Sequence, residues 1–158
     1  MAIVFPNNTI SEVAQGFSYP GTLVQVVEQV LTNNIAFNNW TTFNVLGTAS
    51  ITPTNASNKI LIYIHTTFRQ ASSQGSWSLG IIALRNAAGT ELIRGGWNGT
   101  WRHVIGHYEK QYLHTPGTTA TQVYTLGGYN YPTNGTMYIN NATASDARTI
   151  IRLQEFAI

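Results

Sequence analysis

The sequence contains no cysteine and few charged residues, and both absences restrict what the protein can be. Without cysteine, the chain forms neither disulfides nor thiolate metal sites. Charged residues make up only 9% of the 158 positions, against about 25% in an average soluble domain. Threonine, asparagine, serine and glycine supply the polarity instead. A neutral polar surface loses little hydration energy on docking, which favours an assembly subunit, with a weakly charged monomer as the alternative.

The chain also lacks clustered positive charge and long apolar runs. Its formal net charge is +2, but the eight Lys and Arg residues are scattered. Nucleic-acid binding needs several neighbouring phosphate contacts, so we expect no nucleic-acid partner. No apolar run reaches the roughly 18 residues of a membrane span, and we expect no membrane partner. The first six residues have neither a basic region nor an adequate apolar core, which argues against a signal peptide.

Helical periodicity is almost absent, and the apolar pattern instead repeats every two residues. In the segment 59–68, Ile60, Ile62 and Ile64 point to one side of a strand. The residues between them are also partly apolar, which predicts a central strand buried on both sides. The segment 23–31 fits a helix as well as a strand, but its valine content favours a strand.

Further alternating segments predict an all-β antiparallel fold. Strands are predicted over 40–51, 76–85, 91–97, 103–113, 121–126, 136–140 and 148–157, with turns rich in Gly, Pro and Asn between them. The segment from Asn86 to Thr90 is a hairpin signal. Eight to nine strands without helical crossovers predict a two-sheet jelly-roll sandwich over residues 22–158.

Residues 1–21 differ from the remainder because breakers interrupt them and no strand pattern is present. We interpret this segment as an N-terminal arm that docks onto another protein, with a frayed terminus as the alternative. The docking candidates are the apolar and aromatic side chains Ile3, Val4, Phe5, Phe17 and Tyr19.

Catalytic and metal-binding patterns are missing, so we expect no enzyme, no cofactor and no metal site. His103 and His107 have a zinc-like spacing, but in a strand they stand roughly 13 Å apart. The six carboxylates are spread along the chain, and no nucleophile elbow occurs. Asp146 lies in a turn, where it most simply bonds its own backbone.

Aromatic residues are the best candidates for a binding surface. They gather in the second half of the chain beside arginines, and such sets occur in protein interfaces, in glycan sites and in ordinary cores. All three readings stay open. The candidates for an interface or a glycan site are Trp97, Trp101, Arg102, Tyr108, Tyr112, Tyr129 and Tyr131.

Two segments carry a family resemblance. The stretch ITPTNASNKILI over residues 51–62 resembles a strand–turn–strand pattern of structural proteins from marine and cyanobacterial phages. The stretch GTMYIN over 135–140, followed by residues 145–158, is similar to the C-terminal ending of those proteins. The resemblance implies a homotrimeric jelly roll, related in shape to C1q and tumour-necrosis-factor heads, on the virion. It also implies that the last strand lies near the threefold axis.

Within that resemblance, we favour a capsid decoration (cement) protein on the particle surface. The alternatives are a receptor-binding head of a tail fibre or spike, and a lectin-like glycan-binding module. A fibre protein normally carries a shaft, whereas only about twenty residues, reaching at most roughly 70 Å, precede this sandwich. The expected partners are further copies of the chain, other virion proteins such as the major capsid protein, and host surface glycan.

Overall fold

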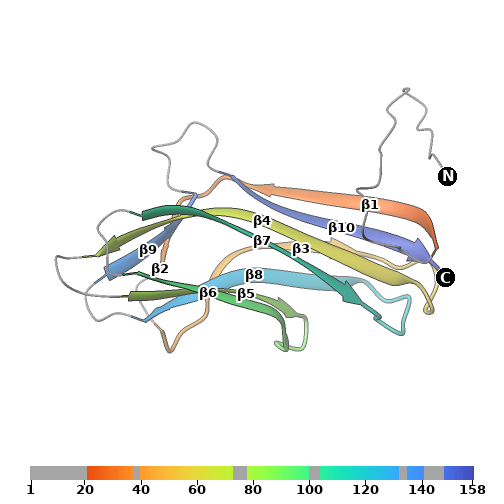
Figure 1. The fold of residues 1–158 in the computed structure, drawn as a ribbon. Helices are drawn as coiled ribbons and strands as arrows, with labels where there is room; N and C mark the ends of the chain where they lie inside the picture. The colour runs from red at the N-terminus through yellow and green to blue at the C-terminus, as the bar shows by residue number, and fades with distance from the viewer. Residues whose placement is uncertain (1–20, 38–39, 73–77, 100–103, 132–134, 141–147) are drawn as a thin grey trace, which may run out of the picture.

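Every regular element in the described part of the chain is a β-strand (Figure 1). The computed structural model describes residues 21–37, 40–72, 78–99, 104–131, 135–140 and 148–158. The strands are β1 (Thr22–Leu31), β2 (Ile35–Phe37), β3 (Asn44–Ile51), β4 (Lys59–Ser72), β5 (Ser78–Asn86), β6 (Glu91–Gly99), β7 (Val104–His114), β8 (Gln122–Tyr131), β9 (Gly135–Ile139) and β10 (Thr149–Ala157). Among these residues there is no helix long and apolar enough to cross a membrane.

The strands form two antiparallel sheets that stack as two layers (Figure 1). The six-stranded sheet has the order β1-β10-β4-β9-β2, and β7 pairs with the other edge of β4. The four-stranded sheet has the order β3-β8-β5-β6. The fourteen-residue strand β4 pairs with β10 through its first half and with β9 through its second half. These pairings confirm the predicted all-β, two-sheet sandwich.

The core lies between the sheets and is built by residues at every second position. Ile60, Ile62 and Ile64 of β4 are fully buried and belong to the same cluster as Leu84 of β5 and Leu126 of β8. The predicted two-sided burial of β4 is only partly correct. Leu61 is buried on the other side of the strand, but the residues that follow it there are only half-buried. The reason is that no layer of the described chain packs over that side.

The predicted elements agree with the structure except in details. The hairpin is present: the Asn86 amide donates to the Thr90 carbonyl at 3.0 Å, and Gly89 adopts a φ of 82°. The strand predicted over 148–157 is present as β10, with Ile151 and Leu153 buried. The three-residue strand Ile35–Phe37 was not predicted. It is too short to show a repeat of two, and it forms because β9 offers it a pairing edge.

A buried carboxylate ties the 51–62 motif to the last strand. Glu155 is fully buried, and its Oε1 accepts hydrogen bonds from the Thr54 amide at 2.7 Å and from Asn58 Nδ2 at 2.6 Å. Its Oε2 accepts one from Gln25 Nε2 at 2.5 Å. Burial acts to raise the pKa of Glu155, but these hydrogen bonds outweigh it and hold the pKa below its usual value. The turn is therefore fixed by the carboxylate rather than by its own sequence alone.

Two glycines lie within strands at places where a neighbouring side chain approaches closely; they are Gly95 of β6 and Gly127 of β8. A Cβ on Gly95 would stand 2.3 Å from Cε2 of Tyr108. On Gly127 it would stand 2.7 Å from Cζ of Phe43. These glycines make room for aromatic rings on the two sides of the four-stranded sheet.

Candidate assembly interface

The outer face of the six-stranded sheet combines apolar side chains with exposure to solvent. We call it the β1–β7 face, because it is formed by the side chains of β1, β10, β4 and β7 that point away from the core. Val24, Val26 and Val30 on β1 and Leu113 on β7 are each 41–46% exposed. Exposed apolar side chains gathered on one face mark sites of association.

The strand register places these side chains in rows across the sheet. One row runs Val26, Gln154, Leu61, Leu113, and another runs Val30, Ile150, His65, Glu109. Neighbours in such a row lie about 5 Å apart, so apolar and polar side chains come into contact across the sheet. The β1–β7 face therefore combines the exposed apolar side chains of β1 and β7 with polar ones such as Gln154 and Glu109.

The charges in the middle of this face neutralise one another. The Arg152 guanidinium contacts the Glu28 carboxylate at 2.7 Å through its terminal nitrogen and at 2.8 Å through Nε. Arg152 also lies 5.9 Å from the centre of the Tyr63 ring. Both charged side chains are about two-fifths exposed. Because the pair is internally balanced, an approaching apolar surface meets little net charge there.

Two histidines and a glutamate lie on the same face at the edge formed by β7. Nδ1 of His65 lies 2.8 Å from Oε1 of Glu109, and the His65 and His107 rings are 5.8 Å apart. The hydrogen bond from His65, supported by Tyr63 and the charge interactions, lowers the pKa of Glu109. The pKa of Tyr63 is raised, mainly by burial and to a smaller extent by the neighbouring Glu109 carboxylate. The carboxylate is thus held ionised between two donors.

The outer face of the four-stranded sheet is organised differently. The Phe43 ring lies against Gly127, and the Arg85 guanidinium stacks on that ring at 4.0 Å from its centre. The Tyr129 ring centre is 5.4 Å from that of Phe43. This group, which we call the Phe43 cluster, covers the sheet with the chain's own side chains.

Glu91 completes the Phe43 cluster by accepting hydrogen bonds from three side chains. Its Oε1 accepts from Arg85 at 3.1 Å and from the Tyr129 hydroxyl at 2.9 Å, and its Oε2 accepts from Arg94 at 3.0 Å. Arg85 also donates to the Tyr129 hydroxyl. Burial acts to raise the pKa of Glu91, but these donors outweigh it and lower the pKa. The cluster engages most of its own polar groups, although Arg85 Nε is buried without a hydrogen-bond partner.

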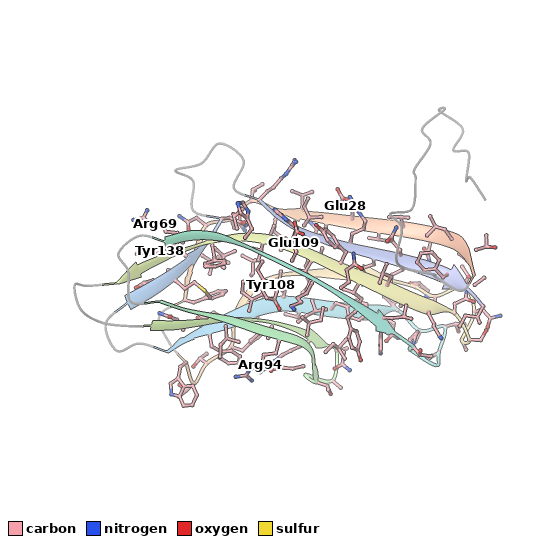
Figure 2. All side chains as sticks on the ribbon, viewed as in Figure 1. Glu28, Arg69, Arg94, Tyr108, Glu109 and Tyr138 are labelled. Atoms are coloured by element: carbon pink, nitrogen blue, oxygen red, sulfur yellow. The ribbon has the colours of Figure 1, made fainter. Side chains whose placement is uncertain are left out.

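The sequence-predicted aromatic set is not one surface. Figure 2 shows Tyr108 between the two layers and Arg94 beyond the four-stranded sheet. Tyr108 and Tyr112 are half-buried against the core, whereas Tyr129 belongs to the Phe43 cluster. For Trp97 and Tyr131 the structure gives the strand but not the side chain. The remaining candidates lie outside the described residues; they are Trp101, Arg102, Ile3, Val4, Phe5, Phe17 and Tyr19.

The β1–β7 face itself was not found from the sequence. The signal was present in β1, where Val24, Val26 and Val30 share one side and alternate with Leu23 and Gln25. It was obscured because apolar residues occupy both sides of that strand. The meeting of His65 with His107 depends on the pairing of β4 with β7, which no local pattern reveals.

No metal site emerges from the described residues: no group of three or more His, Asp or Glu side chains there is placed to hold an ion. His107 lies on β7, while its predicted companion His103 lies outside the described residues. His114 Nδ1 lies 2.7 Å from the buried Tyr124 hydroxyl, on the core side of the sheet. The imidazoles of the described residues therefore contact other protein side chains.

Comparisons with known proteins give structural similarities only. No protein-family model and no curated protein matches the chain. Among solved structures, a mutant VP2 protein of infectious bursal disease virus in T=1 particles is 12% identical, with a TM-score of 0.46, covering 98% of this chain. The virus of the Gx strain gives 13% identity, a TM-score of 0.47 and 95% coverage.

The VP2 subviral particle of the same virus is 12% identical, with a TM-score of 0.44 and 85% coverage. This chain spans about two-fifths of the length of the three viral chains, covering 41%, 42% and 37% of them. At identities and TM-scores this low, no function follows from the similarities.

Proposed function

We propose that this chain is a structural subunit of a bacteriophage particle that forms a homotrimer through the β1–β7 face and decorates the capsid surface. The observation that carries the proposal is the exposed apolar surface of β1 and β7, with its charges paired inside the face. The phage assignment and the number three are supported by the motif resemblance at 51–62 and 135–158. No catalytic activity is part of this proposal.

The contrast between the two outer faces supports self-association on one side only. The four-stranded sheet is covered by the Phe43 cluster, whose polar atoms bond one another. The β1–β7 face has no equivalent covering among the described residues. Fully burying a valine or leucine is worth about 1.5–3 kcal/mol, and these side chains are still 41–46% exposed, so each would contribute a corresponding fraction on association.

The proposal is tested by a matched pair of valine-to-lysine substitutions. Val26 on the β1–β7 face is 46% exposed, and Val45 on the four-stranded sheet is 51% exposed. Val26→Lys places a charge in the apolar surface, so we expect sedimentation velocity to show a trimer converted into monomer. Val45→Lys adds the same charge elsewhere and should leave the trimer intact. Circular dichroism checks that both variants keep the β-sheet spectrum.

Two outcomes contradict the proposed interface. If the wild-type chain stays monomeric at high micromolar concentration, the proposed self-association is wrong. A trimer that survives Val26→Lys but not Val45→Lys moves the interface to the other sheet.

The location on the particle needs its own experiment. Decoration predicts that deleting residues 1–20 abolishes binding to capsids, and that purified particles show this protein over the capsid. Density found only at the tail would instead support a receptor-binding head. Glycan binding gains no support from the described residues, because the Tyr129 hydroxyl and ring are already engaged by Glu91 and two arginines.

A further inference from the structure

We propose that Thr149 and Glu155 set the register in which the last strand, β10, inserts between β1 and β4. The inference does not rest on the proposed function, because it concerns how the strands pair rather than what covers the sheet. Both side chains are fully buried on the core side of β10, one at its first residue and one near its end. We call them the two polar anchors.

The apolar contacts of β10 do not by themselves fix its register. Ile151 of β10 lies opposite Ile64 of β4. Leu153 lies opposite Ile62, and Ile60 continues the same row on the core side. A shift by two residues would again place branched aliphatic side chains opposite one another, and it would keep every side chain on its own face. Burial of apolar area therefore distinguishes these registers only weakly.

No hairpin turn fixes the register either. A hairpin sets the register of its two strands through the length and type of its loop. β10 instead lies between β1 and β4, which both belong to the first half of the chain (Figure 1). The ion pair of Arg152 with Glu28 favours the observed alignment, but both side chains are about two-fifths exposed, so it contributes little. The main restriction therefore comes from buried polar groups.

Glu155 opposes a shift of β10 in one direction. Its Oε1 accepts from the Thr54 amide at 2.7 Å, from the Thr54 hydroxyl at 2.9 Å and from Asn58 Nδ2 at 2.6 Å. Its Oε2 accepts from Gln25 Nε2 at 2.5 Å. A shift by two residues would take the carboxylate from these donors and place it opposite Ile62, in the aliphatic core. An unpaired buried charge disfavours that register by about a hundredfold or more.

Thr149 opposes the shift in the other direction. Its hydroxyl lies 2.6 Å from the Thr66 hydroxyl and donates to Oδ1 of Asn140 at 2.8 Å, and all three residues are buried. Asn140 is itself held in place, because its Nδ2 donates to the Leu31 carbonyl at 2.8 Å. A shift by two residues would move Thr149 opposite Ile64 and separate these polar groups inside the core.

The register of β10 also determines what the outer side of the sheet presents. It places Arg152 between Glu28 of β1 and Tyr63 of β4. A strand that had slipped by two residues would separate the arginine from its carboxylate. The buried anchors therefore position an ion pair on the opposite side of the same strand.

Engineered disulfides can report the register, because the chain has no cysteine of its own. Gln154 and Leu61 are direct partners on the outer side, whereas Gln154 with Tyr63 or with Lys59 reports a shift by two residues in one direction or the other. Direct partners stand about 5 Å apart and diagonal ones about 7–8 Å, at or beyond the reach of a disulfide. Refolding in dilute oxidising solution, with each bond quantified by mass spectrometry, should give the Q154C/L61C bond about a hundredfold more often than either slipped bond.

The double variant T149V/E155L removes both anchors and gives the core side of β10 an unbroken aliphatic row. We expect the slipped bonds Q154C/Y63C and Q154C/K59C to rise at least about tenfold above their level with the natural anchors. Leu153→Ala is the matched control, because it destabilises the core through a cavity but keeps both anchors. It should form the native bond alone.

Three outcomes overturn the inference. In the first, T149V/E155L forms only the native bond. In the second, Leu153→Ala forms the slipped bonds as often as the double variant, so that lost stability alone permits slipping. If the double variant does not refold, the single variants decide: E155Q should raise the Q154C/Y63C bond and T149V the Q154C/K59C bond. The third outcome is the wild-type pattern in both. A native chain that is monomeric contradicts only the proposed function.

Discussion

The two outer faces of this sandwich differ in how their apolar side chains are covered. A sheet has one side on the core, and its other side must be covered, made polar or left for a partner. On the four-stranded sheet, Phe43 fills the space over Gly127, and Arg85 covers the ring. On the six-stranded sheet, Val26 and Leu113 remain exposed. The first face is largely covered by its own chain, although Val45 is still 51% exposed there, and the second is the face that we propose another copy covers.

The difference shows that composition alone does not distinguish a binding surface from a closed one. The four-stranded face contains aromatics and arginines, which are typical of interfaces, yet each is engaged within the Phe43 cluster. The six-stranded face combines valine, leucine and isoleucine, which are typical of cores, with polar and charged side chains. Whether a side chain already has partners is therefore more informative here than its type.

The largest effect is expected from Gly127→Val, which removes the space for Phe43. The new Cβ would stand 2.3 Å from the Asn44 carbonyl oxygen, so the backbone itself must shift. Overpacking of this kind destabilises by about 3 kcal/mol. Urea unfolding of a chain kept monomeric by Val26→Lys isolates this loss from assembly. An unchanged unfolding midpoint would show that the Phe43 cluster is not packed as described.

Glu91→Gln should have an intermediate effect that depends on pH. The neutral amide is a weaker acceptor for Arg85 and Arg94, and we expect a loss of about 1–2 kcal/mol near neutral pH. Because the folded chain lowers the pKa of Glu91, this contribution exists above the unfolded value and disappears as the pH falls through the folded one. The stability difference between wild type and variant should therefore shrink below about pH 4.5.

Denaturant unfolding at several pH values, again in the Val26→Lys background, measures this difference. A gap that stays constant down to strong acid contradicts an ionised Glu91 at the centre of the cluster.

The smallest effect on folding is expected from Val26→Thr on the β1–β7 face. Threonine keeps the branched shape and the strand preference, so the unfolding free energy of the separate chain should change by less than about 0.5 kcal/mol. The hydroxyl nevertheless loses hydration in an interface, so the trimer should be weaker and should dissociate at a higher protein concentration than the wild-type trimer. Val45→Thr is the matched control. Equal effects of both substitutions on sedimentation would remove the distinction between the faces.

The sequence predicted those parts of the fold that follow from local chemistry. The alternation of Ile60, Ile62 and Ile64 identified a core strand, and the Asn86–Thr90 turn identified a hairpin. The strand predicted over 148–157 is also present, as β10 over Thr149–Ala157. In each case a period of two or a turn residue directly reports the backbone conformation.

The parts that could not be predicted depend on which strands become neighbours. The sequence left open whether Tyr108 lies in a binding surface or in the core, and Gly95 on the facing sheet makes room for its ring in the core. Glu155 looked like one isolated carboxylate, although Gln25 and the distant turn with Thr54 and Asn58 donate to it. Residues separated by a hundred positions meet only after the topology is set, so no local pattern encodes their contact.

The central position of β10 makes residues 149–157 the strand on which β1 and β4 both depend. These residues fill the place between β1 and β4, so a chain without them leaves both of those strands without their shared neighbour. Under the proposed function, the surface that another copy would recognise exists only once this strand has inserted.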